Sequence, residues 1–309
     1  MAAVFFLETK AALENITTTF DFVHPLRVSL IYTRNRVEMI NSTGVTNEDF
    51  KSEIDPNNVI HGVDYKVSFI ETAWEHQEEL LAWVLLNNLF AIHEGWVQCL
   101  YDKYYSVDYD WKKFKQLQFP QLQNKFPNYF AKGKNKSLVM TNAFFDVYKN
   151  NSGLDFNKIN NYMLLYRFFK EARNCYMHNN RVASQEVVDA FNSYQTVATI
   201  RDLDCEKVPE IIPPILGQPI QLKIRGVIGF SQFVRRILII SDTYLIQTKA
   251  SETVFLSRKP QNWTTLTLSS NTKRAKNQIT SYSRKFGLLE ATWIPEYQEF
   301  LIKNKIFSK

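Results

Sequence analysis

The stretch LLAWVLLNNLFAIHEGWVQCL, residues 80–100, decides the expected fold. Its apolar side chains recur every three or four residues, at Leu81, Leu85, Leu89, Ile92, Trp96 and Leu100. This spacing places them on one face of an α-helix, which we expect to begin near Glu71 and to end near Tyr105. Such a face must be covered, so the helix predicts a bundle in which other helices pack against it.

Further helices are predicted downstream. One covers residues 155–178, and another, beginning SQEVVDAF, has Ser184 as its expected N-cap. After the proline-rich connector VPEIIPPILGQP, which has no helical interior, the helical period returns from Phe230 to about Leu256. Residues 71–256 are therefore expected to form one helical bundle. Shorter helices are predicted in DWKKFKQLQ, SLVMTNAFFDVYKN, KRAKNQITSYSRKF and PEYQEFLIKNK.

Both ends of the chain differ from this pattern. Residues 1–70 are interpreted as a small mixed α/β segment, because RVSLIYT has the composition of a strand and turn residues follow it. IQLKI and WTTLTL are two further candidate strands. Residues 257–309 form a basic C-terminal extension. It contains ten Lys or Arg and three Glu, a net charge of +7, so the rest of the chain carries −1 of the total net charge of +6. This asymmetry favours an anionic partner such as nucleic acid, with a merely solubilising surface as the alternative.

Composition excludes several classes of protein. The chain is 45% hydrophobic and 14% aromatic, which is enough for a folded core. Its three cysteines show no CxxC spacing, so neither a disulfide framework nor a zinc site is expected. We predict no metal and no cofactor, because no Cys, Asp or Glu stands at metal-ligand spacing from His24, His61 or His76.

The expected location is the cytoplasm. The start MAAVFFLETK lacks the basic and long apolar regions of a signal peptide. The most apolar run, LLAWVLLNNLFAI, is interrupted by Asn87 and Asn88, so no membrane span is expected.

The stretch EARNCYMHNNR, residues 171–181, carries the functional signal. At 100° per residue, Leu165, Phe168 and Ala172 belong to an apolar arc about 140° wide. The opposite, polar side is expected to face solvent and carries Arg167, Lys170, Glu171, Arg173, Asn174, Met177 and His178. Arg173 and His178 lie about 140° apart on this side, and Asn174 can touch His178 four residues later.

The Arg-Asn-x-x-x-His spacing resembles the signature of the HEPN superfamily (higher eukaryotes and prokaryotes nucleotide-binding). The resemblance covers roughly residues 70–256 and is greatest to bacterial families linked to abortive infection and phage defence. It implies a HEPN-like helical bundle, with Arg173 and His178 as catalytic residues of a metal-independent ribonuclease. One HEPN subgroup carries a modifiable Tyr two residues after the His, but this chain has Asn180 there. A regulatory modification of that kind is not expected.

The chemistry of the two residues agrees with RNA cleavage by the 2′-hydroxyl. An imidazole that titrates near neutrality suits the proton transfers, and a permanently charged guanidinium suits the phosphate. Asn174 is expected to orient His178 or to hold a phosphate oxygen. Because one histidine is poorly placed to serve as base and acid on opposite sides of the phosphorus, we expect a homodimer through the motif helix.

Other residues are candidates for supporting roles. Glu94 is expected to pair with Arg173 across the bundle, with an ordinary surface carboxylate as the alternative, whereas neighbouring His93 is interpreted as a packed or surface residue. Lys170 and Arg181 beside the motif are candidate RNA contacts. The same role is open to four residues of the extension, assisted by stacking on Tyr282: Lys273, Arg274, Arg284 and Lys285. Solvated surface is the alternative for the extension.

Three functions are compatible with these features. The first is an endoribonuclease, acting as a toxin or antiviral effector restrained by an antitoxin or a larger defence complex. The second is a non-catalytic HEPN module that binds RNA, a nucleotide or a protein. A structural helical adaptor is the third, and it leaves both the motif and the basic extension unexplained.

Overall fold

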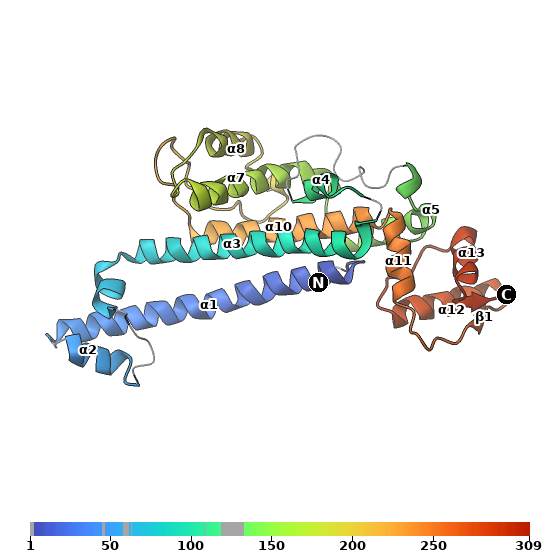
Figure 1. The fold of residues 1–309 in the computed structure, drawn as a ribbon, viewed down its shortest axis with the longest axis horizontal. Helices are drawn as coiled ribbons and strands as arrows, with labels where there is room; N and C mark the ends of the chain where they lie inside the picture. Colours follow the sequence, from blue (N-terminus) through green and yellow to red (C-terminus); the bar gives the residue numbers. More distant parts are fainter. Residues whose placement is uncertain (1–2, 45–46, 58–61, 63, 108, 119–132) are drawn as a thin grey trace.

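The computed structural model describes residues 3–309 apart from 45–46, 58–61, 63, 108 and 119–132. The chain is mainly α-helical, as its sequence predicted (Figure 1). Its four long helices are α1 (Leu7–Ser42), α3 (Trp74–Leu100), α7 (Ile159–His178) and α10 (Ile224–Leu245). The shorter helices are α2 (Asn47–Ile54), α4 (Trp111–Phe114), α5 (Leu138–Met140), α6 (Asp146–Ser152), α8 (Gln185–Gln195), α9 (Ile200–Leu203), α11 (Lys249–Ser257), α12 (Thr272–Lys285) and α13 (Pro295–Lys303).

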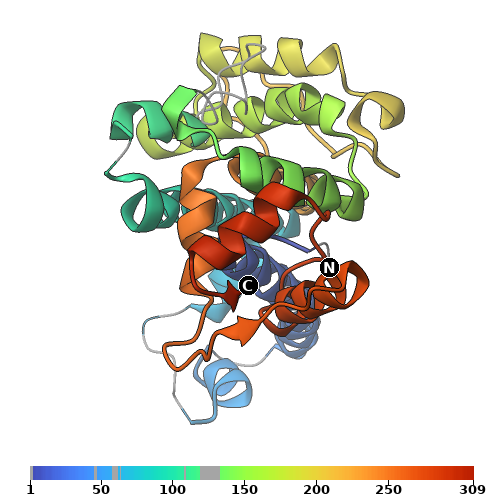
Figure 2. The ribbon, with the colours of Figure 1, turned by 90° about the vertical axis from the view of Figure 1, so that its right-hand side faces the viewer.

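Helices α3 and α10 form the middle of the bundle. Helix α1 packs against both, α7 also contacts both, and α8 packs on α7 (Figure 1). The end view in Figure 2 shows α7 and α8 above this middle layer and α1 with α2 below it. Helices α1 and α7 therefore lie on opposite sides of the bundle.

Helix α3 confirms the prediction made from the stretch at 80–100. It continues into a π-helical turn, Tyr101–Tyr105, and buries Leu85, Leu89 and Trp96 in the core. Among the described residues, Trp74–Tyr105 is the one helix long and apolar enough to cross a membrane. Half of its most apolar window is buried inside the protein, as in the core helix of a bundle.

The N-terminal strand prediction is wrong. RVSLIYT lies inside α1, whose buried residues recur at helical spacing, as Ile16, Phe20 and Val23 show. The strand-like composition of this short run is overridden by packing of the whole helix against α3 and α10. Pro25 removes one backbone hydrogen bond, but it lies on the exposed side, where water can satisfy the freed carbonyl.

The other predicted elements have mixed outcomes. Ser184 is the N-cap residue of α8, and α12 and α13 match two of the predicted short helices. The helix expected to reach Leu256 breaks after Leu245 and resumes as α11. IQLKI forms no strand, since only an isolated bridge joins neighbouring Pro219 to Val182. WTTLTL contains β1 (Leu266–Thr267), which pairs in parallel with β2 (Phe307–Ser308).

One hydrophobic core joins both ends of the chain to the bundle. It runs from Phe5 and Phe6 through the long helices to Leu301 and Phe307. A second, small cluster of Val37, Ile40 and Tyr65 packs the far end of α1 against the segment that follows it. The basic extension thus contributes residues to the same core as the bundle.

A buried carboxylate fixes the start of α1. Asp242 of α10 is fully buried, and its two oxygens accept the backbone N–H groups of Phe5 at 2.6 Å and Phe6 at 3.0 Å. The N-cap residue Phe6 has no capping side chain of its own, so Asp242 supplies the acceptor from another helix. Burial raises the pKa of Asp242 to about 6, although the hydrogen bonds from Phe5, Thr9 and Phe6 oppose this shift.

This pKa predicts how stability depends on pH. Above pH 4 the unfolded carboxyl loses its proton, whereas the folded one keeps it until about pH 6. The Asp242 contribution to the free energy of unfolding should therefore fall by roughly 3 kcal/mol as the pH rises through this window. Urea unfolding of wild type and Asp242→Asn at several pH values measures this contribution, as the unfolding free energy of wild type minus that of the variant. If this quantity increased with pH instead of falling, the hydrogen bonds would outweigh burial.

Candidate active site

The motif helix α7 is anchored by an aromatic face. Phe168 and Phe169 are buried, and the Phe169 ring stacks on Phe230 of α10 with centroids 4.2 Å apart. On the side facing α3, Tyr176 stacks on Trp83 at 4.6 Å. These contacts fix both the depth and the rotation of α7, so its polar side chains have defined positions.

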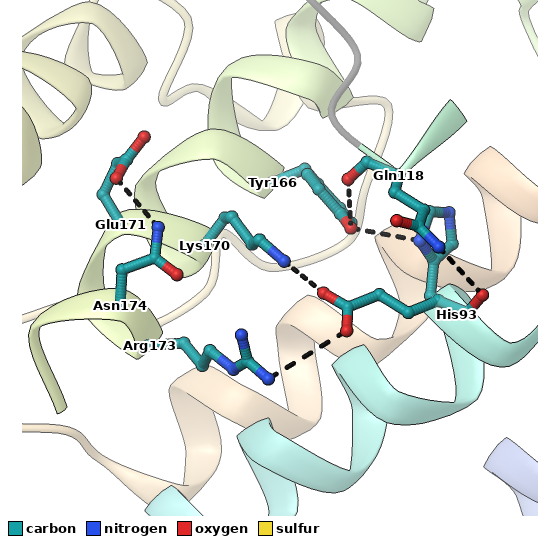
Figure 3. Close-up of polar contacts among 8 residues, drawn as sticks. His93, Gln118, Tyr166, Lys170, Glu171, Arg173 and Asn174 are labelled. Atoms are coloured by element: carbon teal, nitrogen blue, oxygen red, sulfur yellow. Dashed lines mark hydrogen bonds and ion pairs between the residues drawn. The ribbon is translucent and has the colours of Figure 1, made fainter. Parts of the chain in front are cut away.

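The carboxylate of Glu94 on α3 forms ion pairs with two basic side chains of α7. The Lys170 ammonium donates to one carboxylate oxygen, and Nη2 of Arg173 lies 4.0 Å from the other (Figure 3). The predicted contact between Glu94 and Arg173 is therefore present. Lys170 is the closer partner of Glu94, and helical spacing did not predict this pairing.

Lys170 does not lie on the solvated side where the helical projection placed it. Its exposed fraction is 4%, and its ammonium lies 5.2 Å from the centre of the Phe90 ring. The long side chain reaches sideways from α7 towards α3, which a projection that ignores side-chain length does not capture. Burial lowers the pKa of Lys170, while the hydrogen bond to Glu94 acts in the opposite direction.

Arg173 keeps unused hydrogen-bonding capacity. Its side chain is partly exposed, and no hydrogen bond engages its Nε among the described residues; because Nε itself is buried, donors to a ligand would come from the exposed part of the guanidinium. Two cations share the single carboxylate of Glu94, so this group of three side chains carries a net charge of +1. A guanidinium held by a carboxylate at one side, with donors to spare, is suited to bind a phosphate oxygen.

His178 is the last residue of α7, and its side chain is exposed. The geometry of an α-helix places the Cα atoms of Arg173 and His178 about 9 Å apart. At this separation both side chains are long enough to contact the same phosphate group. Among the described residues, Asn174 makes no hydrogen bond to His178; its Nδ2 donates instead to Glu171 at 3.2 Å (Figure 3). The imidazole is thus presented to solvent, as predicted, without the expected asparagine contact.

The turn after His178 is held in a demanding conformation. Asn180 and Arg181 both have positive φ, 46° and 67°, in the left-handed region that non-glycine residues seldom adopt. The Arg181 N–H donates to the Cys175 carbonyl at 3.0 Å, which closes the end of α7. The N–H of Ile220 donates to the Arg181 carbonyl at 2.9 Å, so a hydrogen bond from the end of the proline-rich connector stabilises the turn.

Arg181 is half-buried rather than freely extended. Its guanidinium lies 5.4 Å from the centre of the Tyr176 ring, and Nη1 is 4.0 Å from Glu79 of α3. Trp83, Tyr176 and Arg181 thus form a stacked group beside the motif. Sequence reasoning missed this group, because nothing in the spacing of α3 pointed Glu79 and Trp83 towards α7.

His93 is a packed residue, in agreement with its interpretation. It is completely buried, and its Nδ1 lies 3.0 Å from the Tyr166 hydroxyl, which also lies 3.1 Å from the Gln118 carbonyl (Figure 3). Burial, with a smaller effect of Lys170, lowers the pKa of His93 to about 3. A histidine that stays neutral at physiological pH and lies beneath the site is a scaffold for neighbouring Glu94.

The basic extension lies away from the motif. Helix α12 is at the opposite end of the molecule from the start of α3, which Arg181 contacts (Figure 1). Lys273, Arg274, Arg284 and Lys285 are exposed on α12, but Tyr282 is buried among core aromatic rings. The prediction that Tyr282 stacks on RNA is wrong, since the amphipathic helix turns this ring inwards.

Metal ligands do not gather in the described part of the chain: no group of three His, Cys, Asp or Glu side chains lies close enough together to hold an ion. His61 lies outside the described residues. No family model, no curated protein and no solved structure matches this chain.

The ion pairs of Glu94 predict a stability difference. Glu94→Gln should lower the free energy of unfolding by about 1–3 kcal/mol, because the buried Lys170 ammonium loses its counter-charge. The control is Glu290→Gln, which removes the exposed pair with Arg284 at 3.3 Å and should change stability little. Urea unfolding followed by circular dichroism compares the two variants. Equal effects would contradict a special role for the buried pair.

Proposed function

We propose that this protein is a metal-independent endoribonuclease of the HEPN type. The observation that carries the proposal is the placement of His178 and Arg173 on one helix. The imidazole is exposed at the end of α7, and the guanidinium is held partly open beside Glu94. Neither side chain belongs to the apolar face that packs the bundle, so packing alone does not account for this pair.

The proposed reaction is transesterification within the RNA strand. An imidazole accepts the proton of a 2′-hydroxyl, and the resulting oxygen attacks the adjacent phosphorus. The bond from phosphorus to the 5′-oxygen breaks, and an imidazolium gives this oxygen its proton. The products are a 2′,3′-cyclic phosphate and a 5′-hydroxyl. Arg173 stabilises the additional negative charge on the phosphorane oxygens.

Two copies of His178 suit the two proton transfers. The attacking and leaving oxygens lie on opposite sides of the phosphorus, and one exposed imidazole reaches only one of them. A two-fold axis beside α7 would bring a second His178 to the other side. We propose such a homodimer in the cytoplasm, acting as a toxin or antiviral effector that an antitoxin or a larger complex restrains.

Cleavage of RNA in the presence of EDTA tests this function. Wild type should cleave, whereas His178→Ala and Arg173→Ala should each lose about a hundredfold or more of the rate, because each removes a group that acts in the transition state. His24→Ala is the matched control, since His24 is an exposed histidine on α1. Product ends should carry the cyclic phosphate and the free 5′-hydroxyl.

Two outcomes would overturn the nuclease proposal. Cleavage that disappears with EDTA would indicate a metal-dependent reaction, and cleavage that survives His178→Ala would remove the central residue. RNA binding without cleavage by a verified dimer would favour the non-catalytic module. Toxicity on expression that Arg173→Ala relieves would support the nuclease in cells.

A further inference from the structure

Helix α12 has a polar side whose charges are all positive. At 100° per residue, its basic side chains fall within about half a turn of the helix, opposite the buried Ala275, Ile279 and Tyr282. All of these basic residues are exposed, and the helix contains no acidic residue. We call this surface the basic face of α12, and its members are Lys273, Arg274, Lys276, Arg284 and Lys285.

Most of these charges lack acidic partners. In the described part of the chain, Arg284 is the one member of the basic face with an ion pair, to Glu290 at 3.3 Å. On α1, by contrast, basic side chains pair with acidic ones four residues away. Lys273 and Lys276 are neighbours three residues apart, where like charges lower the stability of a helix. The basic face is therefore not explained by ion pairing within the chain.

The first turn of α12 is an unfavourable place for cations. Its N-cap residue, Asn271, accepts the backbone N–H of Arg274 at 3.1 Å, so the helix begins with an ordinary cap. The N-terminal end of the helix dipole is positive and repels the side chains of Lys273 and Arg274. Folding alone gives no reason for basic residues at these two positions.

A further cation occupies a strained backbone position. Lys305 follows the end of α13 with a φ of 54°, in the left-handed region where helix ends usually have glycine. Its N–H donates to the Ile302 carbonyl at 3.0 Å, and the N–H of Ile306 donates to the Leu301 carbonyl at 2.9 Å, which closes the helix. Glycine would close it with less strain, so a lysine here lowers stability.

Trp263 connects Lys305 to the basic face. Its Nε1 donates to the Ile306 carbonyl at 3.0 Å, and the Lys285 ammonium lies 5.6 Å from the centre of its ring. The ammonium of Lys259 donates to the Lys305 carbonyl at 2.9 Å. Three lysines therefore surround one half-buried tryptophan, and the positive surface continues beyond the end of α12.

We propose that this surface binds the phosphate backbone of RNA. A stacked strand presents one negative charge about every 3.4 Å, and α12 is about 21 Å long, so several phosphates can lie along it. A polyanion explains why cations are kept at positions that the fold disfavours, because it neutralises them. The exposed side chains of Asn277 and Ser281 lie between these cations and can bond phosphate or ribose oxygens.

Other occupants fit this surface less well. A helix that lies on a membrane inserts its apolar face, whereas Ala275, Ile279 and Tyr282 of α12 are buried in the protein core. An acidic protein would need an apolar centre to its interface, and the polar side of α12 has only charged, amide and hydroxyl side chains. Positive charge without exposed apolar side chains is typical of contacts with a nucleic-acid backbone.

The basic face is separate from the motif helix, and RNA binding there goes beyond the nuclease proposal. Helix α12 lies at the opposite end of the molecule from the start of α3 (Figure 1). Trp83, which stacks on Tyr176, is about 26 Å along α3 from Leu100, the end nearer α12. A stacked strand that reaches both surfaces needs about eight nucleotides or more. The surface would therefore anchor long RNA and leave short RNA unaffected.

RNA binding by a His178→Ala variant in EDTA tests the surface without cleavage. The probe is a single-stranded oligouridine of about thirty nucleotides, followed by fluorescence anisotropy at several salt concentrations. Three added substitutions should weaken binding roughly tenfold or more and lower the slope of log K against log salt by about two, because three phosphate contacts are lost. The substitutions are Lys273→Gln, Arg274→Gln and Lys276→Gln.

A matched variant controls for overall charge. It removes three exposed cations from three other segments, and its binding should equal that of its parent. Urea unfolding excludes loss of the fold, since neutralising the first turn of α12 relieves repulsion and should leave stability equal or higher. The control substitutions are Lys66→Gln, Arg201→Gln and Lys207→Gln.

Lys305→Gly separates binding from stability at a single position. Glycine relieves the left-handed turn, so this variant should resist urea at least as well as its parent. It should nevertheless bind RNA severalfold more weakly, because one cation is lost. Lys305→Arg keeps the charge and should retain the binding of the parent.

Three results would overturn the proposal. The first is RNA binding by the α12 triple variant equal to that of its parent, and the second is an equal loss in the charge-matched control. The third is tighter binding to vesicles of phosphatidylcholine and phosphatidylserine than to RNA, which would identify a membrane surface. Absence of cleavage by wild type would overturn only the nuclease proposal, because these binding measurements use a variant that lacks His178.

Discussion

A buried chain of hydrogen bonds from Asp242 holds α10, α1 and α3 in register. The carboxylate of Asp242 on α10 accepts the backbone N–H groups that open α1, and it also accepts a bond from the Thr9 hydroxyl. The oxygen of Thr9 in turn accepts from Trp96 Nε1 of α3 at 2.9 Å. Buried polar groups must find partners, so sliding any one of these helices would leave the others with unsatisfied groups. The position of Trp96 sets that of Glu94, two residues earlier, and through Glu94 the positions of Lys170 and Arg173.

The candidate site therefore depends on rigid elements rather than on loops. Glu94 belongs to the central helix, and the aromatic contacts of Phe169 and Tyr176 fix the rotation of α7. His178 differs from the other members, since it is exposed and lies at the very end of its helix. This division would suit the proposed reaction, because the Arg173 guanidinium is held in place while the imidazole stays accessible to solvent.

Helical periodicity gave reliable predictions where the pattern was long. The apolar positions of α3 and the polar side of α7 follow directly from spacing, and so does the exposure of His178. Spacing failed for RVSLIYT, because seven residues of strand-like composition carry less weight than the burial pattern of a 36-residue helix. It also failed for Lys170, whose long side chain reaches surroundings that an angle on a helical wheel does not describe. Tyr282, by contrast, shares the buried face of α12 with Ala275 and Ile279, and its role was misassigned although the spacing indicates burial. Asp242 is recognisable in the sequence as a single acidic residue within the apolar run of α10. Its hydrogen-bond partners lie more than 230 residues away, so spacing could not predict them.

The left-handed turn at Asn180 and Arg181 has a consequence for how this protein tolerates change. Two adjacent non-glycine residues in that region cost about 1–3 kcal/mol each, so the chain adopts the turn only while the connector near Ile220 holds it. The residue at which α7 ends is therefore determined by a segment forty residues further along the chain. Insertions or deletions in that connector would release the turn and let the helix end elsewhere, shifting the histidine without altering a single residue of the motif.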